Sequence, residues 1–445
     1  MKKNNYIALT IIVLLMVTIM LILNLHQYNK EPIIESIRYE NKFNEDKTRK
    51  VILNIKKYNM NNVYCQFIND EKSSNWILAK DDKCSYNVKT FTYKINIKYN
   101  GNKIVTYNQD FNIDGIANVK ITNKKKYVAL NDSFNIDAKL DYIGDVDTSI
   151  KYESSNPNII SIDENGNINA LKKGTSKISV YSSNKMSDEV EVIVTDLIRP
   201  ATLDNNKEKV PCNFYSEEDI KILDDILKSR VDEAGVGTRG ATAVVARFLT
   251  LEFPFKIPYF YENGRITGNN VEGEGRYYKK GLYLGQTKEN EIKTRMAGPA
   301  SWGCPLMNYE DDGYRKPNTL YPNGLDCSGY VSWILYNAGL DLGDIGAGAS
   351  DEYDYTDVGE LNYNSYDLLH SGRVKVGDLI GWDGHIAVIG AMSDTKIYVT
   401  ESLLPGVIMD EYDYSSPYSN FYSRYDYIID MTNNYKGDGN LKKMW

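Results

Sequence analysis

Cys327 and His385 are the two residues whose types and surroundings in the sequence suggest covalent catalysis. Asp326 precedes Cys327, and apolar residues at the spacing of one helix face follow it: Val331, Ile334, Leu335 and Ala338. This pattern predicts a helix that Asp326 caps, that Cys327 begins and that ends near Gly339. The backbone amides and the dipole at a helix N-terminus favour thiolate over thiol. Cys327 is therefore a candidate nucleophile, although a lone cysteine is more often structural.

His385 is the candidate base for this thiol. The chain has three histidines; His26 lies at the edge of the apolar N-terminal stretch and His370 in a predicted loop. His385 follows the turn signal Asp383-Gly384 and begins a strand of alternating apolar residues. An imidazole on the face of this strand toward the helix can take the thiol proton and later protonate a leaving amine.

A third polar group is expected to orient the imidazole through its other ring nitrogen. A second strand predicted at residues 396–402 forms a hairpin with the His385 strand, so the loop length decides which residue faces His385. A three-residue loop puts Glu401 opposite His385, and a four-residue loop puts Ser402 there. Glu401 is favoured because a carboxylate stabilises the imidazolium, and Asp383, on the exposed turn, is the second candidate.

Length, charge and cysteine count limit the number of domains, the kinds of partner and the disulfide pairing of the chain. A chain of 445 residues predicts two to four domains, and 42% hydrophobic with 25% charged residues is typical of folded protein. The net charge of −8 and the pI near 5.2 argue against nucleic acid as a partner. Five cysteines leave at least one thiol outside any intramolecular pair in an exported protein. Cys65 could pair with Cys84 and Cys212 with Cys304, which would leave Cys327, but spacing alone does not fix disulfide geometry.

The N-terminus carries an apolar segment at residues 6–25 that is long enough to cross a bilayer. Lys2 and Lys3 precede it, which predicts a cytoplasmic N-terminus and an exported remainder. A cleaved signal peptide is the competing interpretation. Residues 24–30 contain no small-residue cleavage site, so residues 1–30 are predicted to be an uncleaved single-pass anchor, with the bulk of the chain extracellular.

Residues 31–116 are predicted to form a small Ig-like sandwich. Residues 51–55 and 91–97 have the composition of strands, and the second segment alternates apolar with polar residues. Trp76 and two cysteines fall in the same region, although their spacing is not that of an antibody domain. No catalytic constellation is visible here.

Residues 117–196 are also predicted to be β-structure. Residues 152–162 read Tyr-Glu-Ser-Ser-Asn-Pro-Asn-Ile-Ile-Ser-Ile, and two further strand segments follow at 163–168 and 170–180. This stretch resembles bacterial Ig-like group 2 modules, with Tyr152 where such modules usually have Trp. The resemblance implies a second all-β sandwich that serves as a spacer or contacts surface proteins or carbohydrate.

Residues 197–210 are predicted to be a polar linker, and the last domain covers residues 211–445. A capping pattern at Ser216 opens one helix, and a second is predicted at about 241–251. The sequence Gly-Val-Gly-Thr-Arg-Gly at 235–240 is a literal G-x-G-x-x-G, but a helix rather than a strand precedes it. A dinucleotide fingerprint requires the strand, so a loop between helices is predicted instead.

Three motifs of the last domain together suggest a family. They are Asp-Cys-Ser-Gly-Tyr-Val at 326–331, Gly-Asp-Leu-Ile at 377–380 and Gly-His-Ile-Ala-Val-Ile at 384–389. The domain resembles the NlpC/P60 superfamily of papain-like cysteine peptidases, which includes the CHAP branch. The resemblance implies an α+β papain-like fold, Cys327 as nucleophile and His385 as base, and Glu401 is similar to the third residue of the CHAP variant. The flanking residues expected to contact substrate are Asp326, Ser328, Trp382 and Asp383.

The same resemblance implies a substrate. NlpC/P60 enzymes cleave peptidoglycan stem peptides, often at a γ-D-glutamyl bond, or the amide that joins peptide to sugar. The N–H of Cys327 and a neighbouring donor would hold the oxyanion. No metal or cofactor is expected, because the sequence has neither HExxH nor zinc-spaced CxxC motifs. The expected partners are the bacterial cell wall and, through the N-terminal helix, the membrane.

Two other functions are consistent with the sequence. The chain could be a non-catalytic surface adhesion protein whose last domain is degenerate, although an intact Cys327 and His385 argue against this. The same residues could instead catalyse acyl transfer, because hydrolysis and transfer share one acyl-enzyme.

Overall fold

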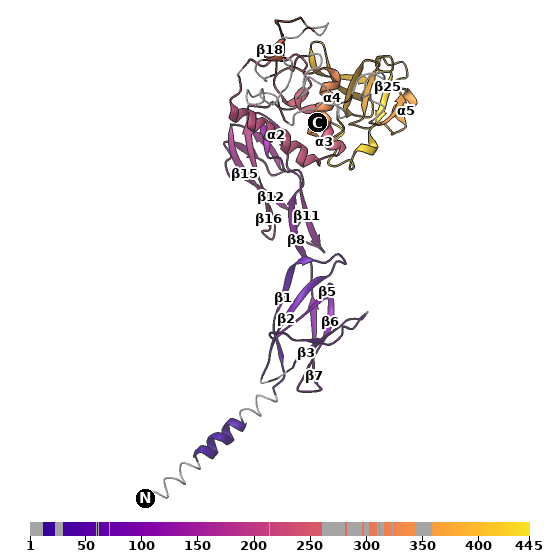
Figure 1. Ribbon diagram of the computed structural model, residues 1–445. Coiled ribbons are helices and arrows are strands. Elements are labelled where there is room, and N and C mark those ends of the chain that lie inside the picture. The colour runs from indigo at the N-terminus through magenta and orange to yellow at the C-terminus, as the bar shows by residue number, and fades with distance from the viewer. Residues whose placement is uncertain are drawn as a thin grey trace. The chain divides into compact units, whose positions relative to one another are not determined.

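The computed structural model describes most of the chain (Figure 1). The residues described are 12–22, 30–58, 60, 62–70, 72–212, 214–259, 281–282, 296–297, 302–308, 311, 316–322, 324–343, 345 and 358–445. They form two compact units. The first comprises Met1–Thr122, Asp137–Glu153 and Ser179–Glu189, and the second comprises Asn123–Ile136, Ser154–Ile178 and Val190–Trp445.

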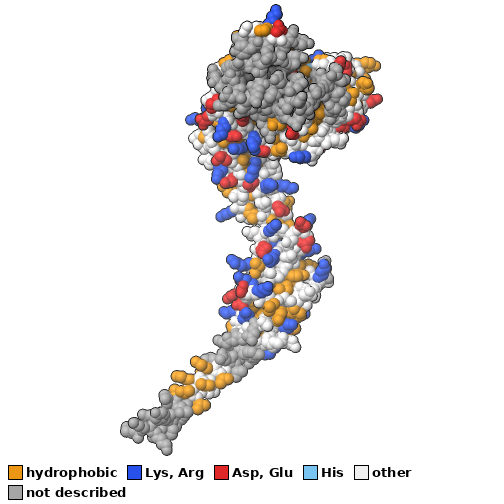
Figure 2. All heavy atoms as spheres, viewed as in Figure 1, with side chains coloured by type: hydrophobic (Ala, Val, Ile, Leu, Met, Phe, Trp, Pro, Cys, Tyr) orange, Lys and Arg blue, Asp and Glu red, His pale blue; other side chains and the backbone are white. Residues whose placement is uncertain are grey.

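Residues 12–22 are helical, and their apolar side chains are exposed (Figure 2). The rest of the predicted anchor, residues 1–11 and 23–29, lies outside the described residues. Within the described ranges, no helix has the length and apolar character needed to span a membrane.

The predicted N-terminal sandwich is present as two sheets, ordered β1-β2-β5 and β4-β3-β6-β7. Its core alternates along the strands; in β6, for example, Tyr93, Ile95 and Ile97 are buried while the residues between them are more exposed. Asn100 and Gly101 take positive φ angles of 44° and 86° in the β6–β7 turn. The strands are β1 (Ile33–Phe43), β2 (Arg49–Lys56), β3 (Tyr64–Ile68), β4 (Ile77–Leu78), β5 (Lys83–Val88), β6 (Phe91–Tyr99) and β7 (Lys103–Phe111).

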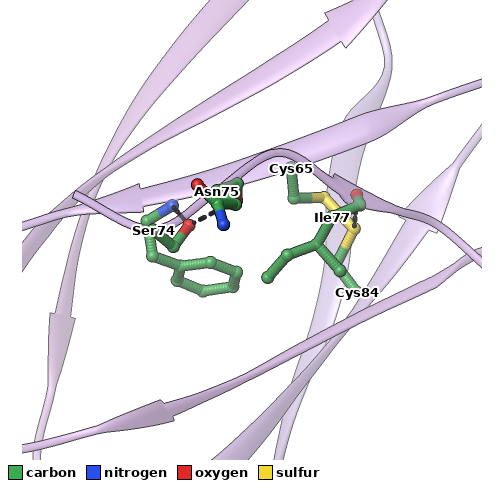
Figure 3. The surroundings of a disulfide bond; sticks show 6 residues. Cys65, Ser74, Asn75, Ile77 and Cys84 are labelled. Atoms are coloured by element: carbon green, nitrogen blue, oxygen red, sulfur yellow. Dashed lines mark hydrogen bonds between the residues drawn. A yellow bond between two sulfur atoms is a disulfide. The ribbon is translucent and has the colours of Figure 1, made fainter.

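A disulfide joins the two sheets of this sandwich (Figure 3). Cys65 on β3 pairs with Cys84 on β5, and both residues are fully buried. Figure 3 shows Ile77 beside the bridge, and its carbonyl oxygen lies 3.8 Å from the Cys84 sulfur. Trp76 is half-buried, and the Lys98 ammonium lies 4.7 Å from the centre of its ring.

The next module consists of short strands in three sheets, ordered β12-β15-β16-β9, β10-β14-β13 and β11-β8. Tyr127 and Ala129 of β9 are buried in the same apolar core as helix α2 (Glu217–Ala234) of the C-terminal region. The strands are β8 (Gly115–Ile121), β9 (Tyr127–Ala129), β10 (Ser133–Asn135), β11 (Ala138–Ile143), β12 (Ile150–Ser154), β13 (Ile160–Ile162), β14 (Asn167–Ala170), β15 (Gly174–Ser182) and β16 (Ser187–Thr195).

The segment at residues 197–210, predicted to be a polar linker, packs on the C-terminal region. Ile198 is buried in its core, and the Asn205 side chain bonds both the N–H and the carbonyl of Met409. Lys207 donates to the carbonyls of Leu249, Thr250 and Phe253 at 2.6, 3.1 and 3.0 Å. These contacts give backbone carbonyl groups of residues 249–253 their hydrogen-bond partners. The polar composition of the segment does not reveal this packing.

The C-terminal region is β-rich, with a six-stranded antiparallel sheet ordered β20-β25-β21-β22-β23-β24. Helices α3 and α4 pack on this sheet at β22. The helices and turns are α2 (Glu217–Ala234), α3 (Arg239–Arg247), η1 (Phe248–Glu252), α4 (Cys327–Asn337), α5 (Tyr366–His370), α6 (Phe421–Arg424) and η4 (Thr432–Asn434). The strands are β17 (Met296–Ala297), β18 (Pro305–Asn308), β19 (Thr319–Pro322), β20 (Glu360–Tyr363), β21 (Leu379–Trp382), β22 (His385–Met392), β23 (Lys396–Leu403), β24 (Gly406–Asp413) and β25 (Tyr427–Asp430).

Both predicted helices at the start of this region are present. Ser216 caps α2, and Asp219 completes the capping box. The second helix is shorter than predicted: α3 ends at Arg247 and continues as the π-helical turn η1. Cys212 pairs with Cys304, so Cys327 belongs to neither disulfide.

Candidate active site

Cys327 is the first residue of α4, as the sequence predicts. The Asp326 side chain accepts from the Gly329 N–H at 2.6 Å, and the Ser328 hydroxyl lies 3.4 Å from the same carboxylate. Asp326 and Ser328 are both buried, so these two predicted substrate contacts form the helix cap. Cys327 is 8% exposed. The cap fixes the helix start and places the sulfur at the positive end of the helix dipole.

His385 begins β22 directly after the tight turn at Asp383-Gly384. Gly384 has a φ of 88°, a conformation that glycine adopts without strain. Trp382 is paired with His385 across this hairpin, and the two rings stack with centroids 4.1 Å apart and an interplanar angle of 27°. Asp383 is exposed on the turn, whereas His385 is only 3% exposed.

Glu401 on β23 is the residue that contacts the imidazole. His385 Nε2 lies 2.6 Å from Glu401 Oε2, and the carboxylate has no exposed surface. The hydroxyl of Tyr425 donates to the other oxygen, Oε1, at 3.1 Å. Arg424 Nη2 lies 3.9 Å from that same oxygen. The carboxylate is thus buried with a hydrogen-bonding or charged partner on each oxygen, as burial of a charge requires.

The register that brings these two residues together differs from the predicted one. Val388 pairs with Thr400 and Ile389 with Val399, but Ala391 pairs with Tyr398, so Gly390 forms a bulge. Continuing the Val388 register places Glu401 opposite Ala387, two residues from His385 and on the same face. The prediction that Glu401 or Ser402 lies directly opposite His385 is therefore wrong; His385 and Glu401 meet diagonally, within reach of long side chains.

Hydrogen bonds tie the Cys327 helix to the strand that carries Glu401. The Ser402 hydroxyl donates to the carbonyl of Leu325, two residues before Cys327, at 2.7 Å. The Tyr330 hydroxyl lies 2.8 Å from that of Thr400 and donates to the Ala246 carbonyl at 2.8 Å. Ser402 and Thr400 flank Glu401, so both contacts bring the start of α4 to this part of β23.

Further ionisable groups surround the Glu401 carboxylate. Burial, with the charge of Glu401, raises the pKa of Asp410, which also accepts from Asn205 at 2.9 Å. Burial and the same carboxylate raise the pKa of Tyr425, so its phenol stays protonated and remains a donor. Arg424 is the nearby cation, with Cζ 4.5 Å from the centre of the Trp382 ring.

Residues 235–238 connect α2 to α3, so the glycine-rich stretch lies between two helices, as the sequence predicts. Arg239 is the first residue of α3; it is 1% exposed and forms an ion pair with Asp378 Oδ1 at 2.7 Å. Asp378 belongs to the Gly-Asp-Leu-Ile motif and also accepts from the N–H groups of Lys375 and Met431. Both residues therefore fix the start of β21 in the core rather than contact a ligand.

The sequence gives no signal for two neighbours of Glu401. Arg424 is the last residue of α6, and Tyr425 lies in the short segment between α6 and β25. No spacing links these residues to Cys327 or His385, and the chain has 36 tyrosines, so residue type carried little signal. Trp382, a predicted substrate contact, is half-buried. Its ring stacks on the imidazole of His385 and also contacts the guanidinium of Arg424.

Comparison with known proteins identifies one module. A family model described as Bacterial Ig-like domain (group 2) matches residues 116–194. These residues are therefore a bacterial Ig-like domain of group 2, and the predicted boundaries, 117–196, differ by one and two residues. A search of curated proteins finds no match to the chain.

Several solved structures are similar to parts of the chain. One is a C-terminal 282-residue fragment of intimin in complex with the intimin-binding domain of its translocated receptor, at 16% identity, covering 44% of this chain and 79% of that one, with a TM-score of 0.23. Domains 4 and 5 of the S-layer protein SbsC match at 13% identity, covering 37% of this chain and 98% of that one, with a TM-score of 0.18. Fibronectin(III)-like modules of Clostridium thermocellum CbhA match at 12% identity, covering 36% of this chain and 94% of that one, with a TM-score of 0.18. Likeness at these TM-scores supports no argument about function.

Proposed function

We propose that the C-terminal region is a cysteine peptidase or amidase of the NlpC/P60 type, with the papain-like core of that superfamily. The observation that carries the proposal is the buried contact of 2.6 Å between His385 Nε2 and Glu401 Oε2, on a sheet against which the Cys327 helix packs. Nucleophilic catalysis uses a base with an orienting carboxylate and a cysteine that the base can reach, and here the cysteine begins a capped helix that packs on the strands carrying His385 and Glu401.

The contact also supports an assignment of the protons on His385. A carboxylate only accepts hydrogen bonds, so His385 Nε2 carries a proton toward Glu401. In the neutral ring the basic atom is then Nδ1. Nδ1 takes the thiol proton of Cys327, and the resulting imidazolium is stabilised by Glu401.

The proposed reaction follows in two steps. The Cys327 thiolate attacks the scissile carbonyl carbon, and the first turn of α4 supplies amide dipoles to the developing oxyanion. Collapse breaks the C–N bond, and the Nδ1 proton passes to the leaving amine. Nδ1 then takes a proton from water, whose oxygen attacks the thioester, and returns that proton to sulfur as the acid product leaves.

Bacterial peptidoglycan is the proposed substrate, with cleavage of stem-peptide bonds, including a γ-D-glutamyl bond. The three motifs that resemble NlpC/P60 support it, as does the bacterial Ig-like domain that precedes the catalytic region. Two disulfides are typical of proteins in oxidising compartments. With the apolar stretch at residues 6–25, they support a membrane-anchored protein whose bulk lies outside the membrane.

The direct test is hydrolysis of purified sacculi by the full chain, with mass spectrometry of the released muropeptides. We expect the wild type to release stem-peptide fragments and Cys327→Ala to release none. Undiminished hydrolysis by Cys327→Ala would reject the mechanism. Products joined to an added amine acceptor would instead identify acyl transfer.

A second candidate function is adhesion without catalysis, which the bacterial Ig-like domain favours. In that case Cys327 should behave as an ordinary buried thiol. Alkylation of Cys327 below about pH 7 distinguishes the two, because an ordinary thiol with a pKa of about 8.5 reacts slowly there.

A further inference from the structure

His385 is supported on its ring face as well as at its Nε2 edge. Trp382 stacks on the imidazole with centroids 4.1 Å apart, and the Arg424 guanidinium lies 4.5 Å from the centre of the Trp382 ring. An indole attracts a cation over its face, and a planar guanidinium can also stack on it. Arg424 thus contacts the residue that covers the face of the imidazole.

Arg424 is also near the residue that holds the edge of the imidazole. Its Nη2 lies 3.9 Å from Glu401 Oε1, while Oε2 of the same carboxylate contacts His385. Glu401 has no exposed surface, and Asp410 adds a second carboxylate nearby, so a local cation offsets a concentration of negative charge. The Arg424 side chain is 39% exposed and lies at the edge of this cluster.

We propose that Arg424 is the positioning residue of the site: it holds Trp382 against the face of His385 and the Glu401 carboxylate against its edge. Tyr425 also adjoins both supports, since its hydroxyl donates to Glu401 Oε1 and its ring centroid lies 5.7 Å from that of Trp382, but Arg424 is the one of the two that carries a positive charge. This role rests on the proposed function and extends it, because the family-like motifs include neither Arg424 nor Trp382. Arg424 orients the imidazole that ionises Cys327 and takes no proton itself.

The test compares Arg424→Gln and Arg424→Lys in the full chain. Gln removes the charge and most of the stacking, whereas Lys keeps a charge but not the planar group. Arg373→Gln is the matched control, since Arg373 is exposed and pairs with Glu360 at 3.5 Å. The readouts are the rate of Cys327 alkylation by iodoacetamide against pH, which needs no substrate, and kcat and KM for muropeptide hydrolysis.

For Arg424→Gln we expect alkylation at about pH 6 and kcat each to fall about tenfold, with KM within about twofold, because His385 keeps its direct partner Glu401 and loses only the residue behind it. Arg424→Lys should recover part of both rates, and Arg373→Gln should match the wild type. An alkylation profile of Arg424→Gln that coincides with the wild type overturns the inference, even if thermal stability and kcat fall. So does an equal loss in Arg373→Gln.

Failure of the proposed function gives a different result. A wild-type chain that is alkylated only as an ordinary thiol, above about pH 8, overturns the proposed function and this inference together. A wild type with an ionised thiol at acid pH and an unchanged Arg424→Gln overturns the positioning role alone.

Discussion

At the scale of single residues, the two oxygens of Glu401 have separate roles. One oxygen contacts His385, and the other accepts from Tyr425. We expect Glu401→Gln to lower kcat by at least about 100-fold, because an amide cannot stabilise the imidazolium and can present its NH₂ to Nε2, which stabilises the wrong tautomer. Steady-state hydrolysis of muropeptides measures this, and Asp394→Asn, at the far end of the same hairpin, should keep the wild-type rate. Unchanged kcat in Glu401→Gln would remove Glu401 from the proposed mechanism.

The residues of the candidate site differ in how visible they are in the sequence. Cys327 and His385 stand in short motifs whose neighbours determine local structure: a capped helix and a two-residue turn. Arg424 and Tyr425 lie beside Glu401 only because the segment before β25 packs next to β23 in the folded protein. Local pattern cannot reveal such long-range contacts, because they depend on how distant elements pack.

At the scale of elements, the β22–β23 hairpin marks the limit of sequence-based prediction. Both strands and the face that carries His385 and Glu401 could be predicted from alternation. Their register could not, for two reasons. The turn closes at the pair Met392–Ile397, later in the chain than the predicted loop, and the bulge at Gly390 then shifts the pairing by one residue. Turn position and bulge together decide this register.

The segment 197–210 yields a prediction about pH. Burial, aided by Arg199, lowers the pKa of Lys207 to about 7, against about 10.4 in an unfolded chain. From pH 7 to about 10.4 the unfolded chain binds a proton that the folded chain has released, so this group makes the free energy of unfolding rise with pH. Below pH 7 both states are protonated and the contribution is constant.

Denaturant unfolding of the wild type and Lys207→Met at about pH 6, 8 and 9.5 tests this. The stability of the wild type relative to the variant should increase from the second pH to the third. A difference that stays constant across the series would show that Lys207 keeps its proton in the folded chain.

The disulfide between the two sheets of the N-terminal sandwich should stabilise that sandwich. Cys65 and Cys84 are 19 residues apart, and closing a loop of this size contributes about 3 kcal/mol. We expect the double variant Cys65→Ala/Cys84→Ala to exchange amide hydrogens faster in β6, by hydrogen–deuterium exchange with mass spectrometry. Peptides from β22 serve as the internal control and should be unchanged. Equal protection of β6 in both proteins would contradict this expectation.

At the scale of the whole molecule, the sequence predicts where the modules begin and end, but it does not predict that neighbouring modules pack on one another. The bacterial Ig-like domain was found within two residues of its boundaries. Tyr127 and Ala129 of that domain nevertheless share a core with α2, and Lys126 donates its backbone N–H to Glu233. Such contacts leave no compositional trace, since each module must bury apolar residues in any case.

A partly buried ion pair lies close to this junction and can be tested by paired substitutions. Arg230 on α2 contacts Glu252 at 3.0 Å, and their side chains are 12% and 17% exposed. Arg230→Met should lower the free energy of unfolding by about 1–3 kcal/mol, because it removes the hydrogen-bonded cation from a partly buried carboxylate. Arg230→Met/Glu252→Leu should recover most of that loss in denaturant unfolding. A double variant as unstable as the single one would contradict the ion-pair explanation.

The pairing of Cys212 with Cys304 has a consequence for how the protein matures. An oxidising compartment offers three thiols to this region, and a bridge from either partner to Cys327 would mask the proposed nucleophile. The masked and correct isomers have the same mass and composition, so mass alone does not tell them apart. The active fraction of a preparation is then counted by titrating the reactive thiol, and thiol–disulfide exchange becomes a step in the protein's activation.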